Sequence, residues 1–286
     1  MADMVGGVRK RFSGAVKTIV LFILLALYMV PFFLVLVNSF KSNGAILSNP
    51  LQLLDPDGAT FGNFVKAWER MNFVRAFGNS LLVTLVSVAL IVLVSSMTAW
   101  LFVRFRWKIN KIFFGAMIAA MIIPFQVIMI PLVSVYGKTL NMLGNPFTLI
   151  LMNLGFGVSM AVFIYHGFIK GGVPLSLEEA ATLDGCSRVQ TFFRVVFPLL
   201  KPTTATIVVL DVLWVWNDYL LPNLVLSNNK DAYTLPLSTY SFYGTYLTDY
   251  GAIMAALVLT ALPVIVMYLF LQKQIISGVI SGAVKA

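Results

Sequence analysis

Six long apolar stretches constrain the fold of this 286-residue chain more than any other feature. Each is close to the ~20 residues that a helix needs to cross the hydrocarbon core of a bilayer. Charged residues make up 11% of the chain, whereas soluble domains usually carry about 25%. The chain is therefore predicted to be an all-α integral membrane protein with six transmembrane helices. These spans lie near residues 18–38, 79–103, 112–134, 147–169, 203–225 and 250–272.

The distribution of basic residues indicates the orientation. The first span follows a basic N-terminal segment, and its apolar core is longer than the ~7–15 residues typical of a signal peptide, so we expect it to be retained. With the N-terminus inside, the inner segments hold 14 of the 20 Lys and Arg residues, four of them in the turn Arg104–Lys111. This bias predicts that both termini are cytoplasmic. Because the net charge of +9 comes from clusters between apolar runs, and not from one basic face, nucleic-acid binding is not expected.

Several kinds of chemistry are excluded by residue counts. The single cysteine, Cys186, and the single histidine, His166, argue against a disulfide and against a Cys- or His-rich metal site. The tripeptide Gly137–Thr139 (GKT) lacks the glycine that a phosphate-binding loop needs five positions earlier, where Leu132 stands. We therefore predict no cofactor, no metal and no catalytic residue.

The segment between the fourth and fifth spans carries strong local signals for helices. The tetrapeptides SLEE (Ser176–Glu179) and SRVQ (Ser187–Gln190) each fit a capping box. Gly185 stands between them, where a left-handed residue would end the first helix, and Pro198 is expected to end the second. The segment is predicted to form two short helices joined at a glycine.

The two helices differ in the surfaces that they offer. The second has an apolar stripe expected to pack beneath the membrane helices, formed by Val189, Phe192, Phe193 and Val196. The first has acidic residues expected to be exposed and a body of small residues, which would allow another protein to approach closely. An ordered inner loop without a partner is an alternative that these signals leave open, because capping says nothing about partners.

The same segment resembles the EAA loop of ABC importer permeases. Glu179-Ala180-Ala181, Gly185 and Pro198 keep the order and spacing of that pattern, and Asp184 and Pro202 add to the match. Val195 and Phe197 depart mildly, since the pattern more often has Ile and Leu there. Three other stretches are similar to the maltose-type, carbohydrate branch, so that the resemblance covers roughly residues 60–286: IIPFQVIMIPL (Ile122–Leu132), WNDYLLP (Trp216–Pro222) and SGVISGAVKA (Ser277–Ala286).

This resemblance implies a type I ABC importer permease fold and a non-catalytic transport subunit of the cytoplasmic (inner) membrane of a bacterium or archaeon. The expected partners are a dimeric cytoplasmic ATP-binding subunit, a second permease that is similar or identical, and an extracellular or periplasmic solute-binding protein. The expected solute is a sugar or an oligosaccharide. The first short helix would be the coupling helix that docks on the ATPase. The residues expected at that contact are Glu178, Glu179, Ala180, Ala181, Asp184 and Gly185.

Two acidic residues inside the fifth span, Asp211 and Asp218, are candidates for the solute pathway. An ionisable group at membrane depth is costly and usually marks a pathway or a buried pairing. The two are seven residues apart, roughly two helical turns, and so would share a face. With Trp214 and Asn217 they would suit a polyhydroxylated solute. A polar patch that pairs with a neighbouring helix remains the alternative, and for Asp218 simple exposure to water.

The predicted domain organisation follows these elements. Residues 1–40 form the N-terminal segment and first span, 41–76 an outer loop, 77–272 the permease domain with its coupling loop 174–202, and 273–286 a cytoplasmic tail. In the outer loop, an interfacial helix is one expectation and a plain connection is the other; the helix would carry Phe64, Trp68, Met71 and Phe77.

Two alternatives to sugar import remain open at the level of sequence. One is an ABC importer for another small solute, such as an amino acid or a polyamine. The other is an ion-coupled secondary transporter with Asp211 as its proton or cation site, although we find no inverted repeat of the kind that such transporters contain. In the third span, Pro124 and Pro131 favour kinks.

Overall fold

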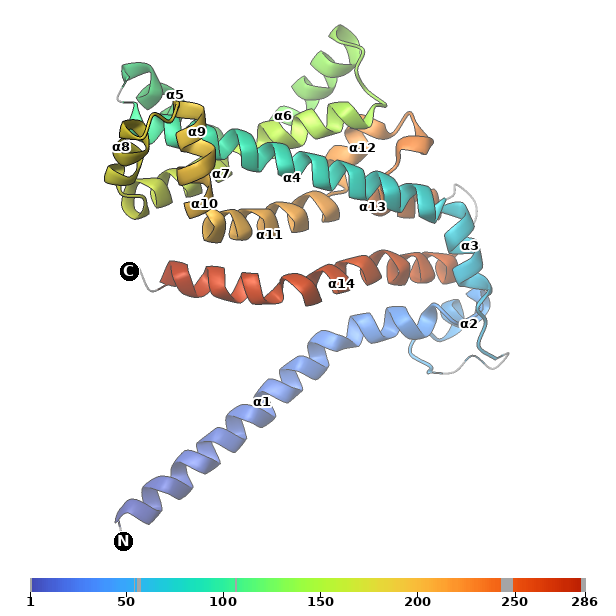
Figure 1. Cartoon of the computed structure of the whole chain (residues 1–286). Helices are drawn as coiled ribbons and strands as arrows, with labels where there is room; N and C mark the ends of the chain where they lie inside the picture. Colours follow the sequence, from blue (N-terminus) through green and yellow to red (C-terminus); the bar gives the residue numbers. More distant parts are fainter. Residues whose placement is uncertain (1, 54, 56–57, 106, 243–248, 284–286) are drawn as a thin grey trace. The chain divides into compact units, whose positions relative to one another are not determined.

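The computed structural model describes residues 2–53, 55, 58–105, 107–242 and 249–283, and within these residues the regular structure is helical (Figure 1). Four helices are long and apolar enough to cross a membrane. Two further pairs of helices pass the same test if each bent pair counts as one span, which makes up to six. Four of the six predicted spans are therefore single long helices, and the count reaches six only if each bent pair is one span. The four single helices are α1 (Ala2–Asn38), α4 (Phe73–Arg104), α7 (Pro146–Gly172) and α14 (Tyr250–Ala283).

The third predicted span is broken. It consists of α5 (Lys108–Ala120) and of α6 (Phe125–Val133), which continues into a π-helical turn at Ser134–Thr139, and the two parts are bent by 101°. Pro124 lies at the break, with extended backbone directly before α6, in agreement with the kink predicted at this proline. Pro131 lies inside α6 and does not end it.

The second bent pair, Arg188–Leu199 and Lys201–Asn217, has a bend of 76° just before the predicted fifth span. Before the bend come α9 (Arg188–Thr191), a π-helical turn (Phe192–Val196) and α10 (Phe197–Leu199). The prediction that Pro198 ends the second short helix is wrong. Pro198 occupies the first turn of α10, where its missing N–H is not needed. The helical run reaches Leu199 instead, and α11 (Lys201–Asn217) begins after the bend.

At its other end, α11 stops earlier than the predicted span at residue 225. The backbone at Asp218 is extended and separates α11 from α12 (Leu220–Leu226). The elements that follow are a 3₁₀ turn (Lys230–Ala232), α13 (Leu235–Ser238) and a second 3₁₀ turn (Thr239–Phe242). Asp218 therefore lies between two helices and is not part of the helix that carries Asp211.

The chain divides into two compact units, one of residues 1–71 with 241–262 and the other of residues 72–240 with 263–286. The first unit contains α1, α2 (Asn43–Ser48), α3 (Gly62–Arg70) and the beginning of α14. The buried Asn63 of α3 donates hydrogen bonds to the carbonyl oxygens of Ser39 (3.0 Å) and Lys41 (2.7 Å). These bonds join α3 to the segment that follows α1.

The helix α3 is the helix predicted in the outer loop. It carries Phe64 and Trp68, and Met71 directly follows it, but Phe77 belongs to α4 in the other unit. The predicted tail is also mostly helical, since α14 continues to Ala283. Residues 284–286 of that tail lie outside the described residues.

The second unit is built around α4, which packs along α7 and α11 (Figure 1). Small residues make this close packing feasible, as is usual for membrane helices. A Cβ at Gly157 of α7 would lie 2.6 Å from Cδ1 of Ile91 on α4. Polar pairs add to the contact: Asn153 donates to the hydroxyl of Ser87 (3.2 Å). The helices of the predicted coupling loop gather near the C-terminal end of α4 (Figure 1).

Candidate functional site

The first short helix, α8 (Leu175–Leu183), begins two residues earlier than predicted. Its N-cap is Pro174, and no side chain caps it. The predicted capping box of Ser176 and Glu179 is therefore wrong, because Ser176 already lies within the helix. The left-handed conformation of Gly185 is confirmed by its φ of +83°, which a glycine adopts without strain.

The second capping box is confirmed. The backbone N–H of Gln190 donates to Oγ of Ser187 (3.3 Å), and the N–H of Ser187 donates to Oε1 of Gln190 (2.8 Å). This reciprocal pair satisfies two donors that the start of a helix leaves free. It fixes where α9 begins after the turn at Gly185.

The predicted apolar stripe on the second helix is half correct. Phe192 and Val196 are buried, while Val189 and Phe193 are exposed. The π-helical turn at Phe192–Val196 explains the difference, because its extra residue per turn changes which side chains share a face. The buried pair packs into the core that α4, α7 and α11 form.

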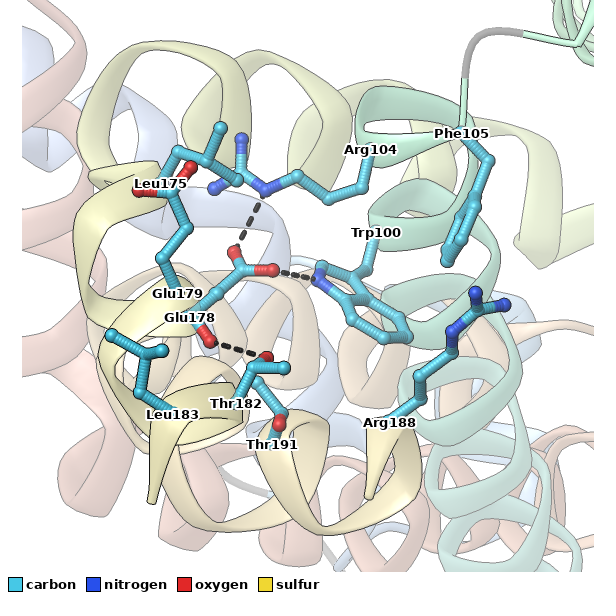
Figure 2. A pocket seen from close by; sticks show the side chains of 10 residues that line it. All are labelled: Trp100, Arg104, Phe105, Leu175, Glu178, Glu179, Thr182, Leu183, Arg188 and Thr191. Atoms are coloured by element: carbon cyan, nitrogen blue, oxygen red, sulfur yellow. Dashed lines mark hydrogen bonds and ion pairs between the residues drawn. The ribbon is translucent and has the colours of Figure 1, made fainter. Parts of the chain in front are cut away.

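Glu178 was expected on an exposed acidic surface, but it is 6% exposed and faces α4 (Figure 2). Its Oε1 accepts a hydrogen bond from Nε of Arg104 (2.7 Å) in an ion pair, and its Oε2 accepts one from Nε1 of Trp100 (2.9 Å). Both donors lie in the last turns of α4. A buried carboxylate is tolerated when its charge is paired and its oxygens are bonded, so the position of Glu178 in the fold is explained by these two partners.

The other predicted contact residues divide by their position on α8. Glu179 and Ala180 are exposed, whereas Ala181 is buried against the rest of the unit. Asp184 and Gly185 are exposed at the end of the helix. Leu183 is 89% exposed, and the sequence reasoning did not single it out. The sequence does contain a sign of this position, because Leu183 is an apolar residue that follows the small residues of the same helix.

A pocket of about 440 Å³ lies between the end of α4 and α8 (Figure 2). Its walls combine aromatic and aliphatic groups with charged groups, and Arg188 lies over the ring of Phe105 at 5.0 Å from the centroid. Such a surface can receive side chains of another protein. The residues that line the pocket are Trp100, Arg104, Phe105, Leu175, Glu178, Glu179, Thr182, Leu183, Arg188 and Thr191.

The predicted pathway residues lie along and just beyond α11. Asp211 is partly buried, and its Oδ2 has no hydrogen-bond partner within the described part of the chain. Trp214 and Asn217 are exposed, and the amide of Asn217 donates to the carbonyl oxygen of Leu213 (2.8 Å). Asp218 accepts from the backbone N–H of Leu220 (3.0 Å). The two aspartates thus have different local roles.

Three residues were missed as site residues by reasoning from the sequence. Trp216 is buried, its ring packs edge-on against Phe77, and its Nε1 has no partner among the described residues. Trp100 and Arg104 hold Glu178, which is 74 residues away from Arg104. No local pattern links positions so far apart, and Arg104 had contributed only to the count of basic residues.

Comparison with known proteins identifies the family. Residues 91–281 match the family model described as "Binding-protein-dependent transport system inner membrane component". The chain belongs to this family. Its members are membrane transport subunits of ABC importers, which argues against an ion-coupled secondary transporter.

Several curated relatives match almost the full length. The protein named "Probable starch degradation products transport system permease protein AmyC" of Thermoanaerobacterium thermosulfurigenes is 41% identical over 92% of this chain and 94% of its own length. The multiple sugar-binding transport system permease protein MsmG of Streptococcus mutans is 34% identical over 91% and 92% of the two chains. The melibiose/raffinose/stachyose import permease protein MelC of Bacillus subtilis is 34% identical over 96% and 97%.

A solved structure supports the fold. A chain of a bacterial ABC transporter involved in the import of the acidic polysaccharide alginate matches with a TM-score of 0.74, covering 92% of this chain and 96% of that one. The two sequences are 20% identical. The match therefore bears on the fold alone, and it agrees with the permease fold expected from the EAA-like loop.

Proposed function

We propose that this chain is a permease subunit of an ATP-driven importer that moves a sugar or an oligosaccharide across the cytoplasmic membrane by alternating access. The observation that best supports this proposal is the 41% identity to the starch-product permease over 92% of this chain. Two further relatives, each 34% identical, are also named for the transport of sugars. An importer for an amino acid or a polyamine would be the alternative, and none of these three names supports it.

The proposed partners follow from the family and from the exposed face of α8. A second permease would complete the pathway, a dimeric ATP-binding subunit would dock on the cytoplasmic side, and a solute-binding protein would deliver the sugar. The surface proposed to touch the ATPase consists of Glu179, Ala180, Leu183, Asp184 and Gly185, all exposed. Small and acidic groups here would let a basic partner surface approach closely. ATP hydrolysis belongs to the partner, and this chain carries no covalent step.

The proposed solute pathway runs beside α11. Asp211 offers a buried carboxylate oxygen that has no hydrogen-bond partner among the residues that the structure describes, and Trp214 offers an exposed aromatic face. Hydroxyl groups of a sugar need acceptors, and its CH faces pack on aromatic rings. Asn217 and Asp218 would extend this polar line toward the outer end of the helix.

The solute and the energy source can be tested together. The transporter would be reconstituted in proteoliposomes with its ATPase, partner permease and binding protein, and uptake of radiolabelled maltotriose and raffinose would be measured. We expect uptake to require internal ATP and to persist when an ionophore collapses the proton gradient. Uptake of an amino acid or a polyamine instead of either sugar, or uptake driven by the gradient without ATP, would overturn the proposal.

The docking surface can be tested with a matched pair of neighbouring alanines. In a Cys186→Ser background, a cysteine replacing Ala180 should cross-link to the ATP-binding subunit, and ATP should change the yield. A cysteine replacing Ala181 serves as the control, because this position is buried within the chain. Equal yields at both positions, or no cross-link from Ala180, would contradict the assignment of this face.

A further inference from the structure

One buried carboxylate, that of Glu178, joins α8 to α4. Both oxygens of Glu178 are bonded to side chains of α4: Oε1 to Nε of Arg104 at 2.7 Å and Oε2 to Nε1 of Trp100 at 2.9 Å (Figure 2). Trp100 and Arg104 are four residues apart and so lie on one face of α4. Two donors on this face therefore hold one acceptor group of α8 from two directions.

Arg104 extends this contact to a third element. Its Nη2 donates to the carbonyl oxygen of Val173 (2.7 Å), the C-cap residue of α7. One guanidinium thus joins the ends of α4 and α7 to the first turn of α8. The planar, forked geometry of arginine holds its partners in fixed directions, which a lysine cannot reproduce.

Because the ion pair of Arg104 and Glu178 is buried, it is costly to separate. The side chains of Arg104 and Glu178 are 14% and 8% exposed, and salt screens a pair at this depth much less than a surface pair. Removing one partner leaves the other charge buried without compensation, which is strongly unfavourable. A separation of α8 from α4 would have the same consequence for both charges, so the pair resists it.

The other end of α4 lies far from this contact. With 32 residues and ~1.5 Å per residue, the helix spans about 48 Å. It is also the helix that packs along both α7 and α11. A displacement imposed on the C-terminal end of α4 would therefore bear on α11, the helix that carries Asp211.

We propose that Glu178 is a positioning residue that makes α8 and α4 move as one body, so that displacement of α8 by the ATPase reaches the solute pathway. This inference rests on the proposed function, since it assumes that an ATPase docks on the exposed face of α8. Glu178 does not touch the ATPase itself. The two adjacent glutamates therefore have different tasks. Glu179 is exposed for contact with the ATPase, and Glu178 is buried and holds α8 to α4.

The test compares Glu178→Gln with the unmodified transporter, assembled with all its partners in proteoliposomes. Three quantities are measured on the same vesicles: ATPase subunit bound per permease, ATP hydrolysed, and radiolabelled maltotriose or raffinose taken up, whichever the unmodified protein imports. We expect Glu178→Gln to bind the ATPase normally and to hydrolyse ATP within about twofold of normal. Solute imported per ATP should fall at least about tenfold, because ATPase movement no longer reaches α4.

The matched control is Asp231→Asn, which removes the partner of Arg75 near the other end of α4. This pair has the same kind of charges but is exposed, so its loss should leave the solute imported per ATP unchanged. A ratio within twofold of normal in Glu178→Gln would overturn the proposal. If no ATPase co-purifies with the unmodified chain, the proposed function itself fails, and this outcome is distinct because it appears before any substitution is made.

A second variant covers the case in which Glu178→Gln does not assemble. Cysteines would replace Arg104 and Glu178 in a Cys186→Ser background, and a reducible bifunctional thiol reagent would join them. We expect solute imported per ATP to recover when the link forms and to fall again when it is reduced. Absence of recovery in linked, assembled protein would overturn the proposal, because a merely structural role predicts no dependence on a reversible tie.

Discussion

The close contact between α4 and α7 depends on the missing side chain of Gly157. A Cβ at this position would lie 2.6 Å from Cδ1 and 3.1 Å from Cγ1 of Ile91, which is fully buried. Carbon atoms in good contact are ~3.5–4.0 Å apart. We expect overpacking in Gly157→Ala to lower the free energy of unfolding by about 1–3 kcal/mol. Higher helix propensity offsets up to about 1 kcal/mol of this loss.

Gly155 on the same helix supplies the matched control, because a Cβ there meets no atom within 4 Å. Gly155→Ala gains the same helix propensity without a clash, so it should be neutral or stabilising by up to about 1 kcal/mol. The difference between the two variants isolates the packing effect, about 1–3 kcal/mol. It can be measured by reversible unfolding in bicelles with increasing SDS.

A compensating substitution makes the reasoning refutable. Ile91→Val removes Cδ1, the atom that a new Cβ at Gly157 would strike, and by itself costs about 0.5–1.5 kcal/mol. The double variant should therefore be more stable than the sum of its single effects predicts, by at least about 0.5 kcal/mol. Additive effects, or equal stability of Gly155→Ala and Gly157→Ala, would show that this contact does not limit the packing of α4 against α7.

Three further substitutions test local features by the same unfolding assay. Gly185→Ala meets no atom within 4 Å but keeps φ at +83°, so it should destabilise by about 1–2 kcal/mol through backbone strain alone; no change would mean that the turn relaxes. Ser187→Ala removes the confirmed cap of α9 and should lower the free energy of unfolding by about 0.5–2 kcal/mol. Adding Gln190→Ala should lower it little further, because both residues belong to one capping box. Two full, additive decreases would contradict a reciprocal capping box. Lys66→Ala breaks a partly exposed ion pair with Asp249 at 3.5 Å and should lower the free energy of unfolding by less than about 1 kcal/mol. High salt should abolish this decrease. A decrease that persists in high salt would mean that Lys66 acts through packing instead.

Much of the membrane topology follows from composition along the chain. A span in lipid must satisfy its backbone hydrogen bonds internally, so a long apolar run predicts a helix with few alternatives. Residues that mark helix ends were also reliable where a single residue decides the backbone geometry, as at Gly185 and at the capping box of Ser187. The break before α6 coincides with Pro124, which the sequence marks directly.

Local signals failed where neighbouring structure decides between equivalent options. Ser176 could cap a helix, yet α8 begins at Leu175 after Pro174. Pro198 could end a helix, yet the bend comes at Leu200. The π-helical turn at Phe192–Val196 moves Val189 and Phe193 out of the predicted stripe. Each of these outcomes depends on how the segment packs against the core, which propensity does not describe.

The two adjacent glutamates of α8 mark the boundary between what the sequence and the fold each decide. The sequence by itself determined the six long apolar stretches, the turn at Gly185 and the family pattern that includes Glu179, because these depend on hydrophobicity and on neighbours along the chain. Only the tertiary structure decided that Glu179 is exposed while Glu178 is buried against Arg104. The reason is that a buried charge requires a partner, and this partner comes from a helix 74 residues away that only folding brings to it.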